Sequence, residues 1–446
     1  MKTNSDEMHN QEMLLKKIRQ SSEVFDKLAN SYEVWVPESG WLAGRRNRDK
    51  NDSKRKNLTD WSILSFLLEI DNCHYPMADS YLQYGIDGVI RIAAETLETL
   101  KNNLQSELQD QTQLDIAYLE SLLHVWKRFR QFVADHMVLA LECAKQETSD
   151  TKKKRYEKIA KICQNLTINK PNTFCEALQL FWFTYLFRSP FGAGCIGRLD
   201  QLLYPFYKHD CEMGIWDQQE AEKMLEEMFT RMNEINTGDT LRNLMLSGQD
   251  AKGNDQTNEI TYLILVAYEN TGGSEPHLNV RFHEKTPKKL RDNCINMLSS
   301  GSGQPTIYFD EAVLPAMEKA GICHEDACQY ANDGCTETVI AGKSAIVFWQ
   351  YEMVKTVELT LFGGNENPCV KPVSMKKNSI HGADFVPKTN LLIGIESKKP
   401  QELTTFSEFL SAFFEQMDHQ LDHYFLMIKQ KMQEDQTVSI TSPFTA

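Results

Sequence analysis

Short runs of β-favouring residues alternate with helical segments in the second half of the chain. Three such runs read HLNVRFH (277–283), PTIYFD (305–310) and TETVI (336–340). Between or before them lie segments such as AEKMLEEMFTRMNEI and KKLRDNCINMLSS, whose apolar residues recur at helical spacing. Because a connection between neighbouring parallel strands usually contains a helix, this alternation predicts an α/β fold with a parallel, helix-wrapped sheet or barrel.

The first part of the chain is predicted to be mainly helical. Residues 12–33 and most of 86–165 alternate apolar and charged positions at the spacing of amphipathic helices. In KPNTFCEALQLFWFTYLF, Thr173 and Glu176 have the spacing of a capping box, which predicts the start of an apolar helix there. Three adjacent large aromatic residues in that segment indicate that this helix is buried on most sides.

Length and composition are those of one large globular protein. The chain has 446 residues, of which 41% are hydrophobic and 25% charged, and no repeat or low-complexity linker divides it. We therefore expect one domain over residues 1–446, mainly helical over about 1–170 and carrying the barrel portion over about 171–446.

Charge and cysteine content limit the expected partners and compartment. The net charge is −14, whereas binding to phosphates calls for an excess of Lys and Arg on one face, so no nucleic acid is expected. The start, MKTNSDEMHNQEMLLKKIRQ, has no secretory apolar run, and no segment reaches the length of a bilayer span. Eleven cysteines without a regular spacing predict reduced thiols. We expect a cytoplasmic protein without a membrane segment.

The stretch ANDGCTETVIAGKS, residues 331–344, places a thiol two positions before a carboxylate. In an extended segment, Cys335 and Glu337 would share one face, with Asp333 beside them if the extension begins early. A carboxylate is suited to acid–base catalysis, and a cysteine to the role of nucleophile, metal ligand or radical carrier. A bare Cys-x-Glu pair is more often part of an inert buried strand, so the pair alone leaves these roles open.

Several further stretches occur in a recognisable order: PNTFCEALQLFWF, GRLDQLLYPFYKHD, LSGQDAKGNDQTNEITYLILVAYE, EPHLNVRFHEKTP, GQPTIYFDEAVLPA and ANDGCTETVIAGKS. With them the chain resembles the glycyl radical enzyme family, whose best-known member is pyruvate formate-lyase. The resemblance is strong over roughly 170–365 and loose over the earlier helices. It implies the N-terminal portion of an α/β barrel wrapped by helices, incomplete as given, with the active cysteine on a loop inside the barrel.

The resemblance also implies roles for the residues of the motif. Cys335 corresponds to the cysteine whose thiyl radical abstracts a hydrogen atom from substrate, and Glu337 to the acid/base that moves protons afterwards. The implied cofactor is a glycyl radical, installed by a separate radical S-adenosylmethionine activating enzyme with an iron–sulfur cluster. The implied partners are that activating enzyme, a small-molecule substrate and a second copy in a homodimer. No metal site is implied.

The chain departs from particular branches of the family. Formate-lyases carry two adjacent cysteines where this chain has Gly334 and Cys335, which disfavours pyruvate cleavage and favours an eliminase or a decarboxylase. Diol dehydratases place a second acid shortly after the glutamate, whereas residues 338–351 contain none. They also place a histidine before the Gly-Arg pair, and SPFGAGCIGR has none. Glycerol and propanediol dehydratases are therefore disfavoured.

Other residues are weaker candidates for binding substrate. His74, in NCHYPMADSYLQYGIDG, resembles a family segment that leads into a helix, although a polar residue at a helix entry is an equally good interpretation. His277 and His283 flank the LNVRF run, and strand-end histidines are often only surface groups. Trp349 is a candidate for an aromatic pocket, although core packing is the more common role.

The C-terminal part lacks the radical-bearing loop of the family. Family members end in an Arg-Val-x-Gly-aromatic loop, whereas no glycine follows Gly394 in this sequence. We therefore expect either a truncated reading of a larger enzyme or one half of a split enzyme whose second polypeptide carries the loop. An inactive paralogue that acts as a scaffold is the alternative.

Two further hypotheses use the cysteines differently. A zinc site built from Cys323, Cys328 and Cys335 is disfavoured, because structural zinc usually draws on cysteine pairs two to four residues apart. A thiol hydrolase is disfavoured because no recognisable nucleophile motif surrounds Cys335.

Overall fold

The computed structural model describes residues 4–45, 80–102, 109–188, 194–234, 242–334, 337–341, 343–344, 353–365, 394–398 and 400–435. The described residues belong to two compact units, one before and one after the boundary between Ile346 and Val347. The helices of the first unit are α1 (Asn4–Ser31), α4 (Ser80–Asn102), α5 (Gln109–Gln146), α6 (Asp150–Ile168), α7 (Phe174–Arg188), α8 (Leu199–Met213), α9 (Gln218–Glu234), α10 (Glu259–Thr271), α11 (Lys288–Ser299), α12 (Asp310–Lys319) and α13 (His324–Ala327).

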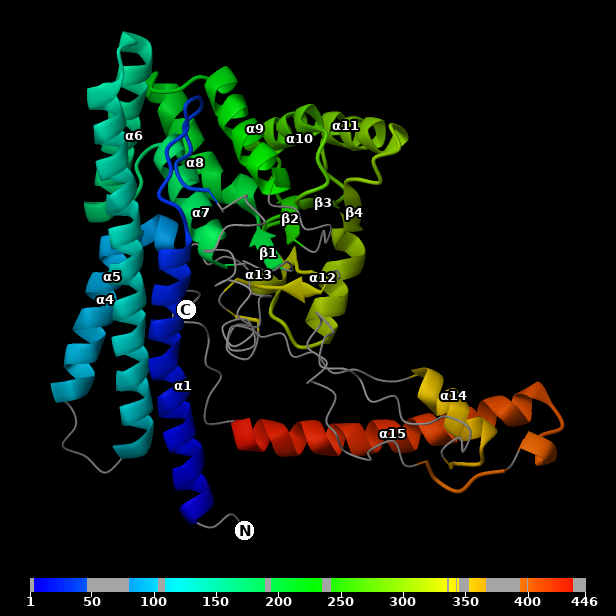
Figure 1. Ribbon diagram of the computed structural model, residues 1–446. Helices are drawn as coiled ribbons and strands as arrows, with labels where there is room; N and C mark the ends of the chain where they lie inside the picture. Colours follow the sequence, from blue (N-terminus) through cyan, green and yellow to red (C-terminus); the bar gives the residue numbers. More distant parts are fainter. Residues whose placement is uncertain are drawn as a thin grey trace. The chain divides into compact units, whose positions relative to one another are not determined.

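A four-stranded parallel sheet is the centre of the first unit (Figure 1). Its strands are β1 (Gly194–Gly197), β2 (Arg242–Ser247), β3 (His277–Phe282) and β4 (Thr306–Phe309), and they lie side by side in that order. Each pair of neighbours is parallel and is connected through helices, as the alternating sequence pattern predicts. The prediction of an α/β fold is confirmed, and so are the strands expected at 277–283 and 305–310. Of the run expected at 336–340, only Thr338–Val339 forms a strand, and it belongs to an antiparallel pair outside the parallel sheet.

One face of the sheet packs against helices α8 to α11 (Figure 1). Leu244, Leu246, Leu278 and Val280 point to that face and belong to one large core cluster with residues of those helices. All four side chains are fully buried, and each contributes about 1.5–3 kcal/mol relative to an exposed position. Parallel strands are normally covered on both faces, so the opposite face also needs a partner.

The opposite face carries the residues that alternate with those leucines. The register places Asn243 beside His277, Met245 beside Asn279 and Ser247 beside Arg281. This face is covered by a short antiparallel hairpin made of β5 (Ala331–Asn332) and β6 (Thr338–Val339), which follows α12 and α13. Buried apolar residues of the hairpin, of α12 and of the strands form a second core cluster: Cys195, Met245, Leu314, Met317, Ala327, Cys328, Tyr330, Ala331, Val339 and Ile340.

The predicted helical region before the sheet is also confirmed. α1 and α4 both pack against the long helix α5, and α6 packs along α5 as well (Figure 1). The capping box forms at the start of α7: the Thr173 backbone N–H donates to Glu176 Oε2 at 3.3 Å, and the Glu176 N–H donates to Thr173 Oγ1 at 3.3 Å.

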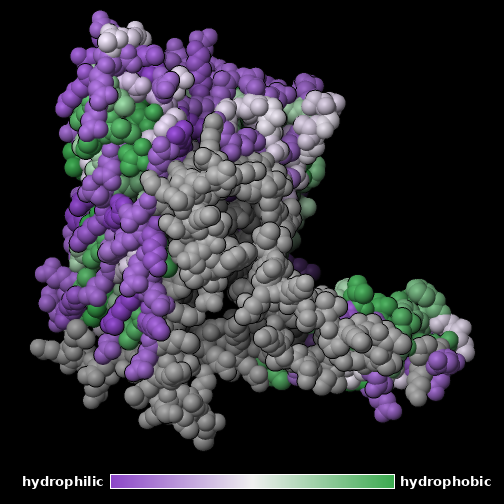
Figure 2. All heavy atoms as spheres, viewed as in Figure 1, coloured by the Kyte–Doolittle hydropathy of each residue, from purple (hydrophilic) through white to green (hydrophobic). Residues whose placement is uncertain are grey.

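The second unit contains α14 (Met353–Leu361), a short 3-10 helix (Pro400–Glu402) and α15 (Phe406–Asp435). α14 packs against α15, and the buried Gln416 of α15 exchanges hydrogen bonds with the backbone of Ile395. Figure 2 shows hydrophobic residues on its surface. Val354 of α14 and Phe406 of α15 are among the exposed large hydrophobic residues. Within the parts of the chain that the structure describes, no helix has the length and apolarity needed to cross a bilayer.

A fully buried histidine of α5 makes the helical layer sensitive to acid. His136 packs against the rings of Phe132 and Phe183, and its Nδ1–H donates to the Phe132 carbonyl at 2.8 Å. Burial lowers the pKa of His136 to about 4. The unfolded chain binds this proton at pH about 6.5, so stability is lost as pH falls from about 6.5 to about 4, by roughly 3 kcal/mol in total.

We predict that His136→Phe removes this acid-dependent loss, because phenylalanine keeps an aromatic ring in the core and does not titrate. The measurement is urea unfolding of both proteins between pH 4 and pH 8. The difference between the two free energies of unfolding should stay constant above about pH 6.5 and change steadily below it. A difference that is independent of pH would contradict the prediction.

Candidate active site

The hairpin formed by β5 and β6 includes Asp333, Gly334 and Glu337, the described residues around the thiol–carboxylate motif. Ala331 pairs with Val339 and Asn332 with Thr338, and the Asp333 backbone N–H donates to the Glu337 carbonyl at 2.8 Å. The hydrogen bond continues this register, so the backbone of Asp333 lies opposite that of Glu337. The Asp333 side chain is buried and Glu337 is half-buried, so the end of the hairpin carries one carboxylate away from solvent and one that reaches it.

Two asparagine side chains of the sheet form a chain of hydrogen bonds that ends on Gly334, the residue before Cys335. Asn243 Nδ2 of β2 donates to the Gly334 carbonyl at 2.8 Å. Asn279 Nδ2 of β3 donates in turn to Asn243 Oδ1 at 2.8 Å. Both asparagines are buried, and Gly334 is buried with them. The end of the hairpin is therefore attached to the inner face of the sheet by a chain of two side-chain hydrogen bonds.

The other end of the hairpin is held by a buried ion pair. Arg281 of β3 donates from Nε and Nη2 to the two oxygens of Asp310, each at 2.8 Å, and neither side chain is accessible to solvent. Arg281 Nη1 also donates to the carbonyls of Cys328 at 2.9 Å and Tyr330 at 3.3 Å. Its guanidinium lies 4.0 Å from the centre of the Tyr330 ring. The guanidinium therefore bonds both to the carboxylate and to the chain that enters the hairpin.

A second buried arginine supports the same segment. Arg198, at the end of β1, donates to the Cys328 carbonyl at 3.3 Å and to the Ser247 carbonyl at 2.9 Å. Burial and the neighbouring Arg281 lower the pKa of Arg198 to about 10, which still leaves it charged at neutral pH. Ser247 has the left-handed φ of 62°, and its N–H donates to Asp200 Oδ2 at 2.8 Å, so the strand end is held in an uncommon backbone conformation.

The residue after Ser247 also has a left-handed backbone conformation, and it has to be glycine. Gly248 has a φ of +96°, and a Cβ atom added there would lie 2.5 Å from the Arg281 guanidinium carbon. The close approach between this backbone and Arg281 is therefore incompatible with any larger residue.

The candidate residues from the sequence do not all fall in the described part of the chain. Cys335, His74 and Trp349 lie outside it, so their positions stay predictions. His283 lies just after β3, and its buried ring pairs with Asp255 Oδ1 at 2.9 Å. His277, at the start of β3, lies 2.9 Å from Thr306 Oγ1 through its Nε2. His283 therefore ties the loop after β2 to the end of β3.

Sequence reasoning missed β2 and the polar residues of the inner face. The segment RNLMLS was not predicted as a strand, although all six residues are buried. A signal was present: Asn243 and Ser247 in RNLMLS, and Asn279 and Arg281 in HLNVRF, are polar residues at every second or fourth position of apolar runs. Such spacing marks one polar face of a buried strand.

No group of three or more metal-ligating side chains occurs among the residues that the structure describes. Of the cysteines considered for zinc, Cys323 is exposed and Cys328 is buried where the chain enters the hairpin. Burial raises the pKa of the Cys328 thiol, which keeps it protonated and a poor ligand.

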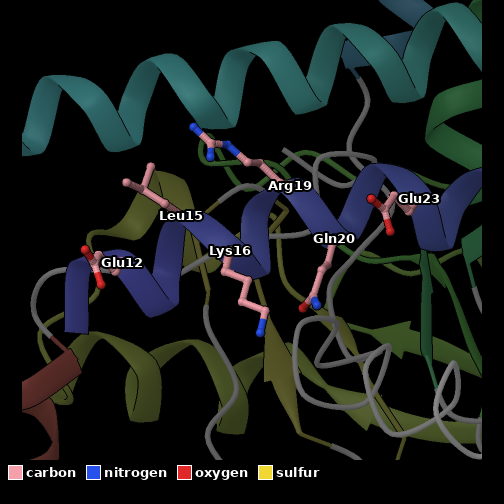
Figure 3. A pocket seen from close by; sticks show the side chains of 6 residues that line it. All are labelled: Glu12, Leu15, Lys16, Arg19, Gln20 and Glu23. Atoms are coloured by element: carbon pink, nitrogen blue, oxygen red, sulfur yellow. The ribbon is translucent and has the colours of Figure 1, made fainter. Parts of the chain in front are cut away.

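A hollow of about 380 Å³ lies along α1 (Figure 3). Its lining includes no residue of the sheet or the hairpin and carries charges of both signs, so we do not assign the chemistry to it. The residues that line it are Glu12, Leu15, Lys16, Arg19, Gln20 and Glu23.

Comparison with known proteins identifies the family. The family model described as "Pyruvate formate lyase-like" matches residues 72–438. The chain belongs to the pyruvate formate-lyase-like family of glycyl radical enzymes. The resemblance inferred from the ordered motifs is thereby confirmed.

Two curated members of the family illustrate the similarity. Trans-4-hydroxy-L-proline dehydratase from Clostridioides difficile is 31% identical over an alignment of 301 residues that covers 64% of this chain and 36% of that protein. Isethionate sulfite-lyase from Oleidesulfovibrio alaskensis is 28% identical over an alignment of 333 residues that covers 69% of this chain and 37% of that protein. The chain thus spans little more than a third of the length of these relatives.

A solved structure supports the fold. The glycerol-bound form of the B12-independent glycerol dehydratase from Clostridium butyricum matches with a TM-score of 0.74 at 21% identity. The match covers 97% of this chain and 60% of that chain. The parallel sheet with its covering helices is therefore the architecture of this family, as the sequence predicts.

We predict that Asp310→Asn lowers the free energy of unfolding by about 3–5 kcal/mol, because it leaves the buried Arg281 charge without a carboxylate. Urea unfolding, followed by circular dichroism, measures the change. Combining Arg281→Met with Asp310→Leu should recover only part of the loss, because the carbonyls of Cys328 and Tyr330 lose their donor.

The control for this prediction is Glu95→Gln on α4, which breaks an exposed pair with Arg91. Its unfolding midpoint should equal that of the wild-type chain, because solvent-exposed pairs contribute little. An equal decrease in the free energy of unfolding in Glu95→Gln and Asp310→Asn would contradict the prediction, because burial of the ion pair would then make no difference.

Proposed function

We propose that this chain is the part of a glycyl radical lyase that carries the hydrogen-abstracting thiol, with Cys335 as the radical carrier and Glu337 as the acid/base. The observation that supports the proposal most is the hairpin, which fixes Gly334 against the sheet and sets Glu337 beside Asp333. An inert strand would not need two carboxylates and an asparagine chain at its end. Gly334 and Glu337 are the first and last residues of the Gly-Cys-x-Glu motif.

The reaction assigned to these residues is an elimination. Cys335 Sγ, as a thiyl radical, takes a hydrogen atom from a substrate C–H bond, so an S–H bond forms and the unpaired electron moves to carbon. Glu337, as the acid, then donates its proton to the leaving group, which departs with the electron pair of the neighbouring bond. The radical cation that remains returns a proton to the Glu337 carboxylate and becomes the neutral product radical. The product radical takes the hydrogen atom back from the Cys335 thiol, which regenerates the starting state of the cysteine.

The unpaired electron comes from a glycyl radical installed by a radical S-adenosylmethionine activating enzyme. Gly394 does not fit that role: its surrounding sequence, LLIGIES, lacks the Arg-Val-x-Gly pattern. A Cβ at Gly394 would lie 2.5 Å from Gln416 Oε1, so it is packed inside the second unit. We therefore assign the radical store to another part of the enzyme, on a longer or a second polypeptide, and expect the complete enzyme to be a homodimer.

The substrate we propose is a small organic molecule with a leaving group beside the abstracted hydrogen. The names of the two curated relatives state a dehydration and a release of sulfite, both of which are eliminations. Gly334 in place of a second cysteine favours this class over the cleavage of pyruvate. Trans-4-hydroxy-L-proline and isethionate are therefore the first compounds to assay.

We predict that Cys335→Ser abolishes turnover in the completed, anaerobically activated enzyme, because an oxygen radical would be too reactive to form by exchange with a glycyl radical. Serine is close to cysteine in size, so circular dichroism should show an unchanged fold. Substrate consumption and the glycyl electron paramagnetic resonance doublet are measured together. Turnover that survives in this variant would refute the proposal.

We predict that Glu337→Gln lowers kcat by about 10²–10⁴, the usual contribution of a positioned acid or base, while hydrogen abstraction continues. Exchange of deuterium between labelled substrate and the Cys335 thiol measures the abstraction step by itself. Loss of that exchange would contradict an acid/base role. If the wild-type enzyme turns over no substrate although its radical forms, the chain is the inactive scaffold.

A further inference from the structure

Two buried asparagines form a chain of hydrogen bonds that ends on the residue before Cys335. Asn279 Nδ2 donates to Asn243 Oδ1 at 2.8 Å, and Asn243 Nδ2 donates to the Gly334 carbonyl at 2.8 Å. The two residues come from neighbouring strands and are almost completely inaccessible to solvent. The contact therefore runs from the middle of the sheet to the end of the hairpin.

Asparagine at two buried strand positions destabilises the fold unless its side-chain amide forms hydrogen bonds. An amide taken out of water loses free energy unless its donors and acceptor are paired, and apolar residues are the usual occupants of such positions. Asn279 Oδ1 has no hydrogen-bond partner among the described residues. An apolar side chain at 279 would avoid that loss, so the advantage of asparagine lies in what its amide donates to.

The bonds also fix which way each amide points. Because Asn243 Nδ2 donates to the Gly334 carbonyl, its Oδ1 must face the Asn279 amide nitrogen. Turning the Asn243 amide over would set two acceptors against each other at Gly334 and two donors against each other at Asn279. Asn279 Nδ2 is held further by the His277 carbonyl at 3.2 Å. The donor that reaches Gly334 is therefore oriented before any substrate binds.

This contact is separate from the one that holds the start of the hairpin. Arg281 and Arg198 bind the carbonyls of Cys328 and Tyr330, whereas Asn243 binds Gly334 at the far end. Loss of the asparagine bond should therefore loosen the end that leads to Cys335 and leave the entry of the hairpin in place.

We propose that Asn243 and Asn279 are positioning residues that hold the backbone at Gly334 and so aim the Cys335 thiol at its hydrogen donor. This inference rests on the proposed function of Cys335. Hydrogen transfer needs the reacting atoms near van der Waals contact, so a small displacement of the sulfur slows it strongly. Neither asparagine touches substrate in this assignment; both act through the hairpin.

The first test measures thiol exposure and does not depend on catalysis. Full-length wild-type chain and Asn243→Asp are treated with iodoacetamide at pH 8, and the alkylation rate of each cysteine is read by peptide mass spectrometry. The aspartate of this variant would place a carboxylate oxygen against the Gly334 carbonyl and break the bond. The alkylation rate at Cys335 should rise about fivefold or more, the effect of losing one hydrogen bond.

The chain provides its own references for this test. Cys294 on α11 is fully buried and reports global opening, whereas Cys323 is exposed and reports the activity of the reagent. Asn296→Asp, at an exposed position of α11, is the matched control substitution. An unchanged rate at Cys335, or an equal rise at Cys335 and Cys294, would overturn the inference. If Asn243→Asp does not fold, Asn243→Ser gives the same comparison.

The second test uses the completed, activated enzyme. In Asn243→Ser and Asn279→Ala, kcat should fall about tenfold or more with KM within about twofold, and the deuterium isotope effect on kcat should grow as abstraction becomes slower. If Cys335→Ser is inactive but these variants keep the kcat and isotope effect of the wild type, the positioning role is wrong and the proposed function stands. If Cys335→Ser is active, the proposed function itself fails.

Discussion

The buried ion pair between Arg281 and Asp310 is the interaction on which the arrangement of the inner face depends. It joins the end of β3 to the start of α12, and the same guanidinium bonds to the backbone that leads into the hairpin. Two charges in a dry interior are tolerated only when they are paired and otherwise hydrogen-bonded, which this geometry achieves. The requirement extends to the neighbouring backbone, because the guanidinium leaves room only for glycine at Gly248.

The inner face of the sheet is divided into a polar end, an apolar middle and a charged end. Met245 and Cys195 lie in the middle and pack against Ala331 and Val339 of the hairpin. At the charged end, Arg281 bonds to the backbone where the chain enters the hairpin. At the polar end, Asn243 bonds to Gly334, the residue before Cys335. Apolar packing alone would hold a two-stranded hairpin weakly in register, since such a hairpin is only marginally stable by itself. The hydrogen bonds at both ends supply the missing specificity.

This division is consistent with the proposed role of the segment in radical chemistry. A thiyl carrier has to be held firmly, because its reactivity is not selective and only geometry limits what it attacks. The hairpin is held by its contacts with β1 and β2 and by the hydrogen bond from Asn243 to Gly334, and the half-buried Glu337 keeps access to solvent. Membership in the glycyl radical enzyme family gives this arrangement its chemical context.

The sequence by itself determined the class of fold, the strands at 277–283 and 305–310, the capped start of α7 and the family, because each depends on local periodicity or on an ordered set of motifs. It did not reveal β2 or the roles of Asn243, Asn279 and Arg281. Those roles arise from contacts between residues about 30 to 90 positions apart, such as Asn243 with Gly334. Hydrogen bonds of that range depend on strand register and on which face of the sheet the hairpin covers, so only the tertiary structure decided them.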